Sequence, residues 1–206
     1  METKLDSNNV RDWAIFGVAA AVLAGLLVYH HSLTVPGGAA RMRAESRARE
    51  WAATWPEQPR KTAGLMISRY GPPDRKTAES MIWNSRRPWK RIVVHRAAEG
   101  KPMEQAISYD IPPGKTAALV LFDHGLAVEP GSWEISARSD SEALNFLTLN
   151  LADDVAVGRM SPDEADTFFK KTVELRAAGK SSSYTDGLRF RPASADRPPI
   201  TYRTIY

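Results

Sequence analysis

Seventeen residues without a charge cover positions 13–29 (WAIFGVAAAVLAGLLVY), and residues 30–35 extend this stretch as far as Pro36. At a rise of about 1.5 Å per residue, a helix over residues 13–35 exceeds the hydrocarbon thickness of about 30 Å. Trp13 and Tyr29 stand where aromatic rings favour the headgroup level. The pattern predicts one transmembrane helix over residues 13–35. Its expected lipid-anchoring side chains are Trp13, Phe16, Leu23, Leu26, Leu27 and Tyr29.

A cleaved signal peptide is the main alternative for this segment. A signal peptide begins with a basic region, whereas residues 1–12 contain three acidic side chains and two basic ones. We therefore expect an uncleaved anchor in the bacterial inner (cytoplasmic) membrane, preceded by a polar tail over residues 1–12. Two basic residues precede the helix and four follow it, which favours a cytoplasmic domain over a periplasmic one.

The segment after the anchor, residues 36–58, is predicted to form an Arg-rich amphipathic connector helix that ends at Pro56. Small and aromatic residues recur in it at helical spacing, with arginines on the other faces. Arginines beside tryptophans next to a membrane span indicate a helix that lies on headgroups or on a neighbouring subunit. A connector packed on its own domain is the alternative.

Residues 59–191 are predicted to form an α+β domain with a small antiparallel sheet and an αα-hairpin. A helix is expected from Pro59 to Tyr70 and another over residues 112–124. Strands are expected over residues 80–84, 89–96, 103–111, 126–129, 133–138 and 188–190. Two further helices begin near Ser139, which has capping-box spacing to Glu142, and at Ser161, and end at Gly158 and Gly179. Residues 192–206 are predicted to be an extended Pro-rich tail.

The chain of 206 residues has no cysteine and a net charge of +4. The absence of cysteine excludes disulfides, Cys-bound zinc, iron–sulfur clusters and thiol nucleophiles. The modest charge is unlike the uniform basic face of a duplex-binding protein.

Five segments occur in order along the domain: YGPP from Tyr70, Ile82-Trp83, PWKR from Pro88, ARSD from Ala137 and NFLTLNLA from Asn145. In these the chain resembles a group of uncharacterised bacterial proteins that share a single small domain, over roughly residues 55–190. The resemblance implies a compact shared module with an added anchor and tail, and implies no activity.

Candidate catalytic groups are few. His30 and His31 flank the membrane, where one of them is a candidate axial ligand of a tetrapyrrole, although a hydrated imidazole is the simpler interpretation. His95 and His124 have no neighbouring ligand cluster. Gly114-Lys115-Thr116 lacks the first glycine of a phosphate-binding loop.

The acidic candidates Asp153-Asp154 and Glu142 are interpreted as solvated helix positions. We therefore expect no metal, no cofactor and no enzyme, unless a deep pocket includes these groups.

A basic-aromatic run over residues 83–91 (WNSRRPWKR) is a candidate protein contact, because Arg and Trp dominate binding hot spots. One hairpin gives little support for nucleic acid, and no nucleic acid or small-molecule substrate is expected. The tail supplies apolar anchors. The predicted partner-binding residues are Arg41, Arg43, Arg47, Trp51, Trp55, Arg86, Arg87, Trp89, Arg91, Ile200, Tyr202, Ile205 and Tyr206.

These features predict a non-catalytic accessory subunit that anchors to the membrane and stabilises a larger bacterial membrane complex. Energy-converting complexes of the respiratory or photosynthetic reaction-centre type are the first hosts to test, by analogy with other one-helix subunits. Its partners would be the other subunits and the lipid bilayer. The alternative is a membrane-tethered binding or assembly module that acts transiently.

Overall fold

A computed structural model describes residues 37–193, apart from 98–99 and 129–132. The predicted polar tail, the transmembrane helix and residues 194–206 of the predicted extended tail therefore lie outside the described residues. None of the described helices combines the length and the hydrophobicity needed to cross a bilayer. The chain divides into two compact units, Met1–Arg47 and Ala48–Tyr206.

The boundary between the units falls inside the predicted connector, within helix α2 (Gly38–Ala52). In the first unit, Arg41, Arg43 and Arg47 are exposed on α2. The helix is shorter than predicted. Trp55 lies beyond its end and is 4% exposed, so it belongs to the core of the second unit.

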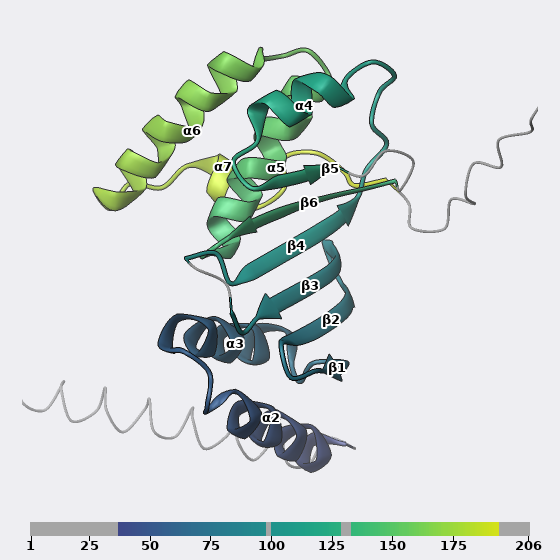
Figure 1. The fold of residues 1–206 in the computed structure, drawn as a ribbon, viewed down its shortest axis with the longest axis vertical. Helices are drawn as coiled ribbons and strands as arrows, with labels where there is room; N and C mark the ends of the chain where they lie inside the picture. The colour runs from purple at the N-terminus through teal and green to yellow at the C-terminus, as the bar shows by residue number, and fades with distance from the viewer. Residues whose placement is uncertain (1–36, 98–99, 129–132, 194–206) are drawn as a thin grey trace, which may run out of the picture. The chain divides into compact units, whose positions relative to one another are not determined.

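The second unit is an α+β domain around one six-stranded antiparallel sheet in the order β1-β2-β3-β4-β6-β5 (Figure 1). The strands are β1 (Arg75–Lys76), β2 (Ser80–Arg86), β3 (Trp89–His95), β4 (Met103–Ser108), β5 (Leu126–Val128) and β6 (Glu134–Ser139). The predicted meander is confirmed as β2, β3 and β4. Residues 188–190 form no strand with the described residues, and β1 was not predicted because its two residues are both exposed and basic.

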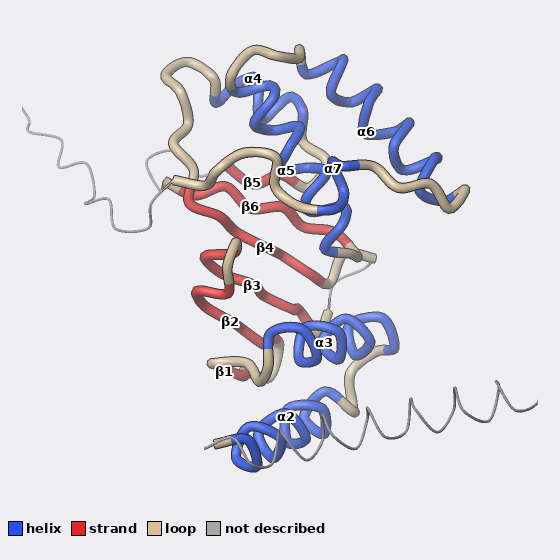
Figure 2. The backbone as a smooth tube through the Cα atoms, turned by 180° about the vertical axis from the view of Figure 1, so that it is seen from behind, coloured by secondary structure: helices blue, strands red, loops and turns tan. Residues whose placement is uncertain are grey.

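Helices supply the other side of the core. They are α3 (Glu57–Tyr70), α4 (Thr116–Phe122), α5 (Glu142–Ala156), α6 (Pro162–Ala177) and α7 (Ser183–Asp186). Helix α3 packs on β2 and β3, while α5 packs on β4, β5 and β6 and is flanked by α4, α6 and α7 (Figure 2). This contact of α5 with α6 confirms the predicted αα-hairpin. Because α5 has neighbours on several sides, it is buried well beyond the single stripe that its leucines predict.

Helix α6 begins where the sequence predicts, whereas helix α5 does not. Ser161 caps α6 with a full capping box to Glu164, as its Ser-Pro-x-Glu pattern predicts. Helix α5 instead begins at Glu142 with Ser141 as its N-cap, so the capping box expected between Ser139 and Glu142 does not form. The Ser139 hydroxyl oxygen instead accepts from the backbone N–H of Ser141 at 3.3 Å, and Glu142 turns into the core.

Gly125 lies directly before β5, where its backbone approaches β6. Its φ is +77°, and a Cβ there would lie 2.4 Å from the carbonyl oxygen of Arg138. Gly125→Ala is expected to lower the free energy of unfolding by about 2 kcal/mol, measured by urea denaturation followed by circular dichroism. Gly114→Ala is the control, because Gly114 also has a φ of +77° but open space around it, and should cost about 1 kcal/mol. Equal losses would contradict the close approach.

Candidate functional site

A buried carboxylate joins α3 and α5 to the sheet. Glu142 is 8% exposed, and its Oε1 accepts hydrogen bonds from Trp89 Nε1 at 2.7 Å, from Gln105 Nε2 at 3.0 Å and from the Tyr70 hydroxyl. Its Oε2 lies 2.5 Å from Nη1 of the exposed Arg69. One guanidinium and three neutral donors therefore compensate this charge. We call these five residues the Glu142 cluster.

The cluster continues as a chain of satisfied polar groups. Asn145 Nδ2 donates to Gln105 Oε1 at 2.9 Å, and the Ser139 hydroxyl donates to Asn145 Oδ1 at 2.7 Å. Phe146 stacks on the Trp89 ring with centroids 4.9 Å apart. A buried network in which the members satisfy one another specifies how the elements pack, so we assign it a structural role.

Burial, followed by the hydrogen bond to the Glu142 carboxylate, raises the pKa of Tyr70 well above its usual value of about 10. The phenol therefore stays protonated throughout the ordinary pH range. It acts as a fixed hydrogen-bond donor to Glu142 and is a poor proton acceptor.

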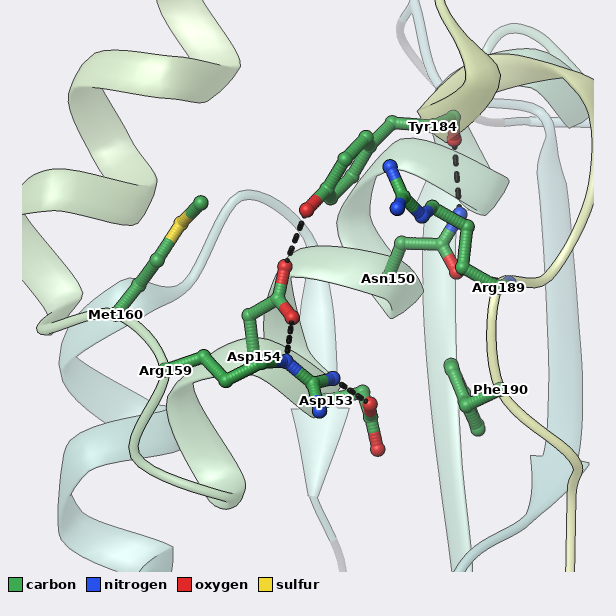
Figure 3. Close-up of a pocket in the computed structure, with 8 residues that line it drawn as sticks. All are labelled: Asn150, Asp153, Asp154, Arg159, Met160, Tyr184, Arg189 and Phe190. Carbon is green, nitrogen blue, oxygen red and sulfur yellow. Dashed lines mark hydrogen bonds and ion pairs between the residues drawn. The ribbon is translucent and has the colours of Figure 1, made fainter.

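A second polar cluster lines a cavity of about 390 Å³ between α5 and the C-terminal segment (Figure 3). Arg159 and Met160 also line a wider groove of about 800 Å³ along α6. The sequence interpretation of Asp153 and Asp154 as solvated helix positions is wrong, because α7 and the chain after it cover this end of α5. The cavity is lined by Asn150, Asp153, Asp154, Arg159, Met160, Tyr184, Arg189 and Phe190.

Every carboxylate oxygen of the aspartate pair has a donor. Asp153 accepts from the Tyr109 hydroxyl at 2.8 Å and from Nη2 of Arg159. Asp154 accepts from Nε of Arg159 and from the Tyr184 hydroxyl at 2.8 Å. The two aspartates are 7% and 4% exposed. In this arrangement neither aspartate presents an uncommitted oxygen as a general base.

The two tyrosines that donate to the aspartate pair stay protonated for the same reason as Tyr70. Burial, and then the hydrogen bond to Asp153, raises the pKa of Tyr109, and burial followed by the bond to Asp154 raises that of Tyr184. The hydrogen bond to Asp154 in turn raises the pKa of Arg159, so the guanidinium remains charged. The lining offers fixed donors and aromatic faces.

Asn150 attaches the C-terminal segment to α5. Its Nδ2 donates to the carbonyls of Tyr184 at 3.0 Å and Gly187 at 2.8 Å, and its Oδ1 accepts from the Arg189 backbone at 2.7 Å. The Arg189 guanidinium lies over the Tyr184 ring, 4.3 Å from its centroid. Ala193 then donates its backbone N–H to the Ser108 carbonyl at 2.9 Å, which brings the segment to the end of β4.

A third charged group lies on the sheet face opposite to α3 and α5. Glu134 accepts from Lys90 at 2.9 Å and from Arg91 at 2.7 Å, and Arg91 also contacts Glu104 at 3.2 Å. The hydrogen bond from His95, with the charge of Arg91, holds the pKa of the Glu104 carboxyl below its usual range. Arg91, a predicted partner residue, is thus engaged by two carboxylates of its own sheet.

The structure separates the predicted partner residues into two groups. Trp89 and Trp55 are 1% and 4% exposed, so their prediction as direct contacts is wrong, because both fill the core. Trp51 is 47% exposed, Arg87 is exposed and Arg86 pairs with Asp74 at 2.7 Å. The predicted anchor residues, together with Ile200, Tyr202, Ile205 and Tyr206, lie outside the described residues.

The remaining candidates have local structural partners. His124 stacks on Phe169 with centroids 3.9 Å apart and contacts Asp166 at 2.9 Å. Lys115 occupies the N-cap position of α4, without a capping hydrogen bond from its side chain. Within residues 37–193, gaps excepted, no group of His, Asp and Glu is arranged to hold a metal ion. His30 and His31 lie outside that part of the chain.

No family model, curated protein or solved structure matches this chain. The geometry above is therefore the basis on which a function is assigned.

Proposed function

We propose that this chain is a non-catalytic accessory subunit of a bacterial membrane complex, anchored by residues 13–35 and bound to neighbouring subunits through α4 and β5. One observation carries the proposal. Helix α4 is apolar on all sides, with Leu119 and Phe122 buried at 0% and 2% but Val120 and Leu121 exposed at 62% and 77%. A helix that is apolar all round is normally covered on all sides, so a partner is needed for its outer face.

The adjoining strand indicates a protein as the partner. β5 is an edge of the sheet, and the described chain places no further strand beside it. An edge strand presents backbone N–H and C=O groups that another polypeptide can pair with. A neighbouring protein that offers apolar side chains and a strand would therefore complement α4 and β5 together.

The polar clusters support a role without catalysis. Glu142 is compensated by donors from α3 and the sheet, and Asp153 and Asp154 are saturated by Arg159 and two tyrosines. Groups held in this way stabilise the fold of a binding module. A respiratory or photosynthetic complex remains the first host to test.

Leu121→Glu tests the partner surface. The tagged full chain is extracted with its membranes in mild detergent and followed on native electrophoresis. Wild type should migrate with a larger complex, whereas the variant should run alone, because a buried charge would weaken the contact roughly tenfold or more. The stability of the domain should change by less than about 0.5 kcal/mol, since the side chain is exposed.

Leu65→Glu is the matched control, because Leu65 is a 66% exposed leucine on α3. It should migrate as the wild type does. A wild-type chain that runs alone, or a Leu121→Glu chain that stays with the complex, would contradict the proposal. The first result would favour a transient binding module.

A further inference from the structure

Charge is divided unevenly within the second unit. Residues 48–97 contain eleven Lys and Arg and four Asp and Glu, a net charge of +7 with histidine neutral. The described residues from 100 to 193 contain ten basic and thirteen acidic side chains, a net charge of −3. The basic excess of the chain is thus concentrated in the first third of the domain.

The strand order places the basic part and the acidic part of the domain at opposite ends of the sheet. β1, β2 and β3 are consecutive at one end of the sheet and α3 packs on them, whereas α4 to α7 gather at the other end (Figures 1 and 2). The β1 edge is therefore the basic end, and the β5 edge is the acidic end. The proposed partner surface lies at the acidic end.

An exposed indole accompanies the cations at the β1 edge. Trp51 Nε1 donates to the Thr77 carbonyl at 3.3 Å, and the Lys76 ammonium lies 5.4 Å from the indole ring centroid. Arg75 and Lys76 are both exposed and have no carboxylate partner among the described residues. Tryptophan beside Lys and Arg is the combination that favours the headgroup layer of a membrane.

The chain also enters the domain at this end. Arg49, near the end of α2, donates to the Gly64 carbonyl at 3.2 Å and to the Ser68 hydroxyl at 2.8 Å, which fixes the entry beside α3. Within the second unit, the start of the chain therefore lies at the basic end and not at the acidic one.

We propose that the β1 edge, with Arg75, Lys76 and Trp51, lies against anionic phospholipid headgroups. This inference rests on the proposed membrane anchoring, and the opposite charges of the surface and the lipid carry it. The protein then uses the two edges of one sheet for two partners: β1 for lipid and β5 for a neighbouring subunit.

The test uses the full chain, whose lack of cysteine permits single spin labels. Ala78, in the turn after β1, and Ala177, at the end of α6, are both exposed and are each replaced by cysteine. The labelled chains are reconstituted into phosphatidylcholine vesicles with or without phosphatidylglycerol. Accessibility to a water-soluble nickel chelate should fall roughly threefold at Ala78→Cys when phosphatidylglycerol is present, should recover in high salt, and should stay constant at Ala177→Cys.

Charge reversal provides a second comparison. Adding Arg75→Glu and Lys76→Glu to the Ala78→Cys chain should abolish the protection by phosphatidylglycerol. The matched changes Lys171→Glu and Lys180→Glu, both at exposed positions of the acidic end, should preserve it. Circular dichroism verifies that each variant is folded.

The outcomes separate this inference from the proposed function. A chain that leaves the vesicles in high salt contradicts the membrane anchor. A chain that is retained while Ala78→Cys stays fully accessible overturns the lipid contact alone. Protection that arises only when host subunits are added would assign the β1 edge to protein and would also overturn it.

Discussion

Glu142→Ala is expected to lower the free energy of unfolding by about 4 kcal/mol. The change leaves Gln105 Nε2, in a residue exposed by 0%, without its acceptor and deprives the Tyr70 hydroxyl of its partner. The Trp89 indole, in a residue exposed by 1%, loses its shorter hydrogen bond and retains only the Tyr70 hydroxyl oxygen, 3.0 Å from Nε1. Each buried donor left unpaired costs about 1–3 kcal/mol. Urea denaturation followed by tryptophan fluorescence measures the loss.

Glu142→Gln is the control for this variant. Its amide oxygen retains an acceptor for the three donors, while the charge that faces Arg69 is lost. Because Arg69 is exposed, its ion pair contributes little, and the loss should be about 1 kcal/mol. If the alanine and glutamine variants are equally stable, the neutral donors do not need Glu142 as their acceptor. The assignment of a structural role to Glu142 is then wrong.

Arg159→Met is expected to destabilise the domain by about 2 kcal/mol at neutral pH, about 1 kcal/mol for each aspartate contact, because the guanidinium itself is 58% exposed. Methionine preserves much of the side chain's length but leaves Asp153 and Asp154, exposed by only 7% and 4%, as two adjacent uncompensated carboxylates. Urea denaturation followed by circular dichroism measures the loss.

Arg189→Met is the matched control in the same cavity. The Arg189 guanidinium lies over Tyr184 and donates to the Ser183 hydroxyl at 3.1 Å, and no carboxylate among the described residues pairs with it. Its replacement should cost less than about 1 kcal/mol. A loss of equal size in both variants would show that Arg159 has no special relation to the aspartates.

Local patterns in the sequence were sufficient to predict most elements. α3 keeps its predicted apolar face of Ala63, Met66 and Ile67, and α6 starts where its capping box indicates. β2, β3 and β4 follow the β-branched and aromatic runs. These helix and strand patterns involve residues that are close together in the sequence, so they can be recognised from the sequence of this chain by itself.

The burial of the basic-aromatic run was not predictable in this way. Trp89 and Ile92 both point into the core although they are three positions apart, so the alternation of a regular strand is broken near the hairpin. Ser85, with a φ of +53°, marks this irregularity. Trp89 therefore fills the space between α3 and α5, where the sequence pattern suggested a surface contact.

The Glu142 cluster was missed because an acidic residue in the first turn of a helix resembles a favourable cap. A usable signal was nevertheless present. Glu142 and Asn145 occupy the same i, i+3, i+7 stripe as Leu149, Ala152 and Ala156, all buried. Polar residues on an apolar stripe indicate a buried network, but their partners Tyr70 and Gln105 come from distant segments that only the folded chain brings together.

The position of α4 and β5 in the topology has an evolutionary consequence. Between β4 and β6 the chain leaves the framework for residues 109–133, forms α4 and the edge strand, and returns so that Ile135 pairs with Ile107. The other five strands pair with one another without β5. Descendants of this domain can therefore acquire new partners by changing the exposed positions of α4, Val120 and Leu121, while the buried Leu119 and Phe122 continue to fill the core.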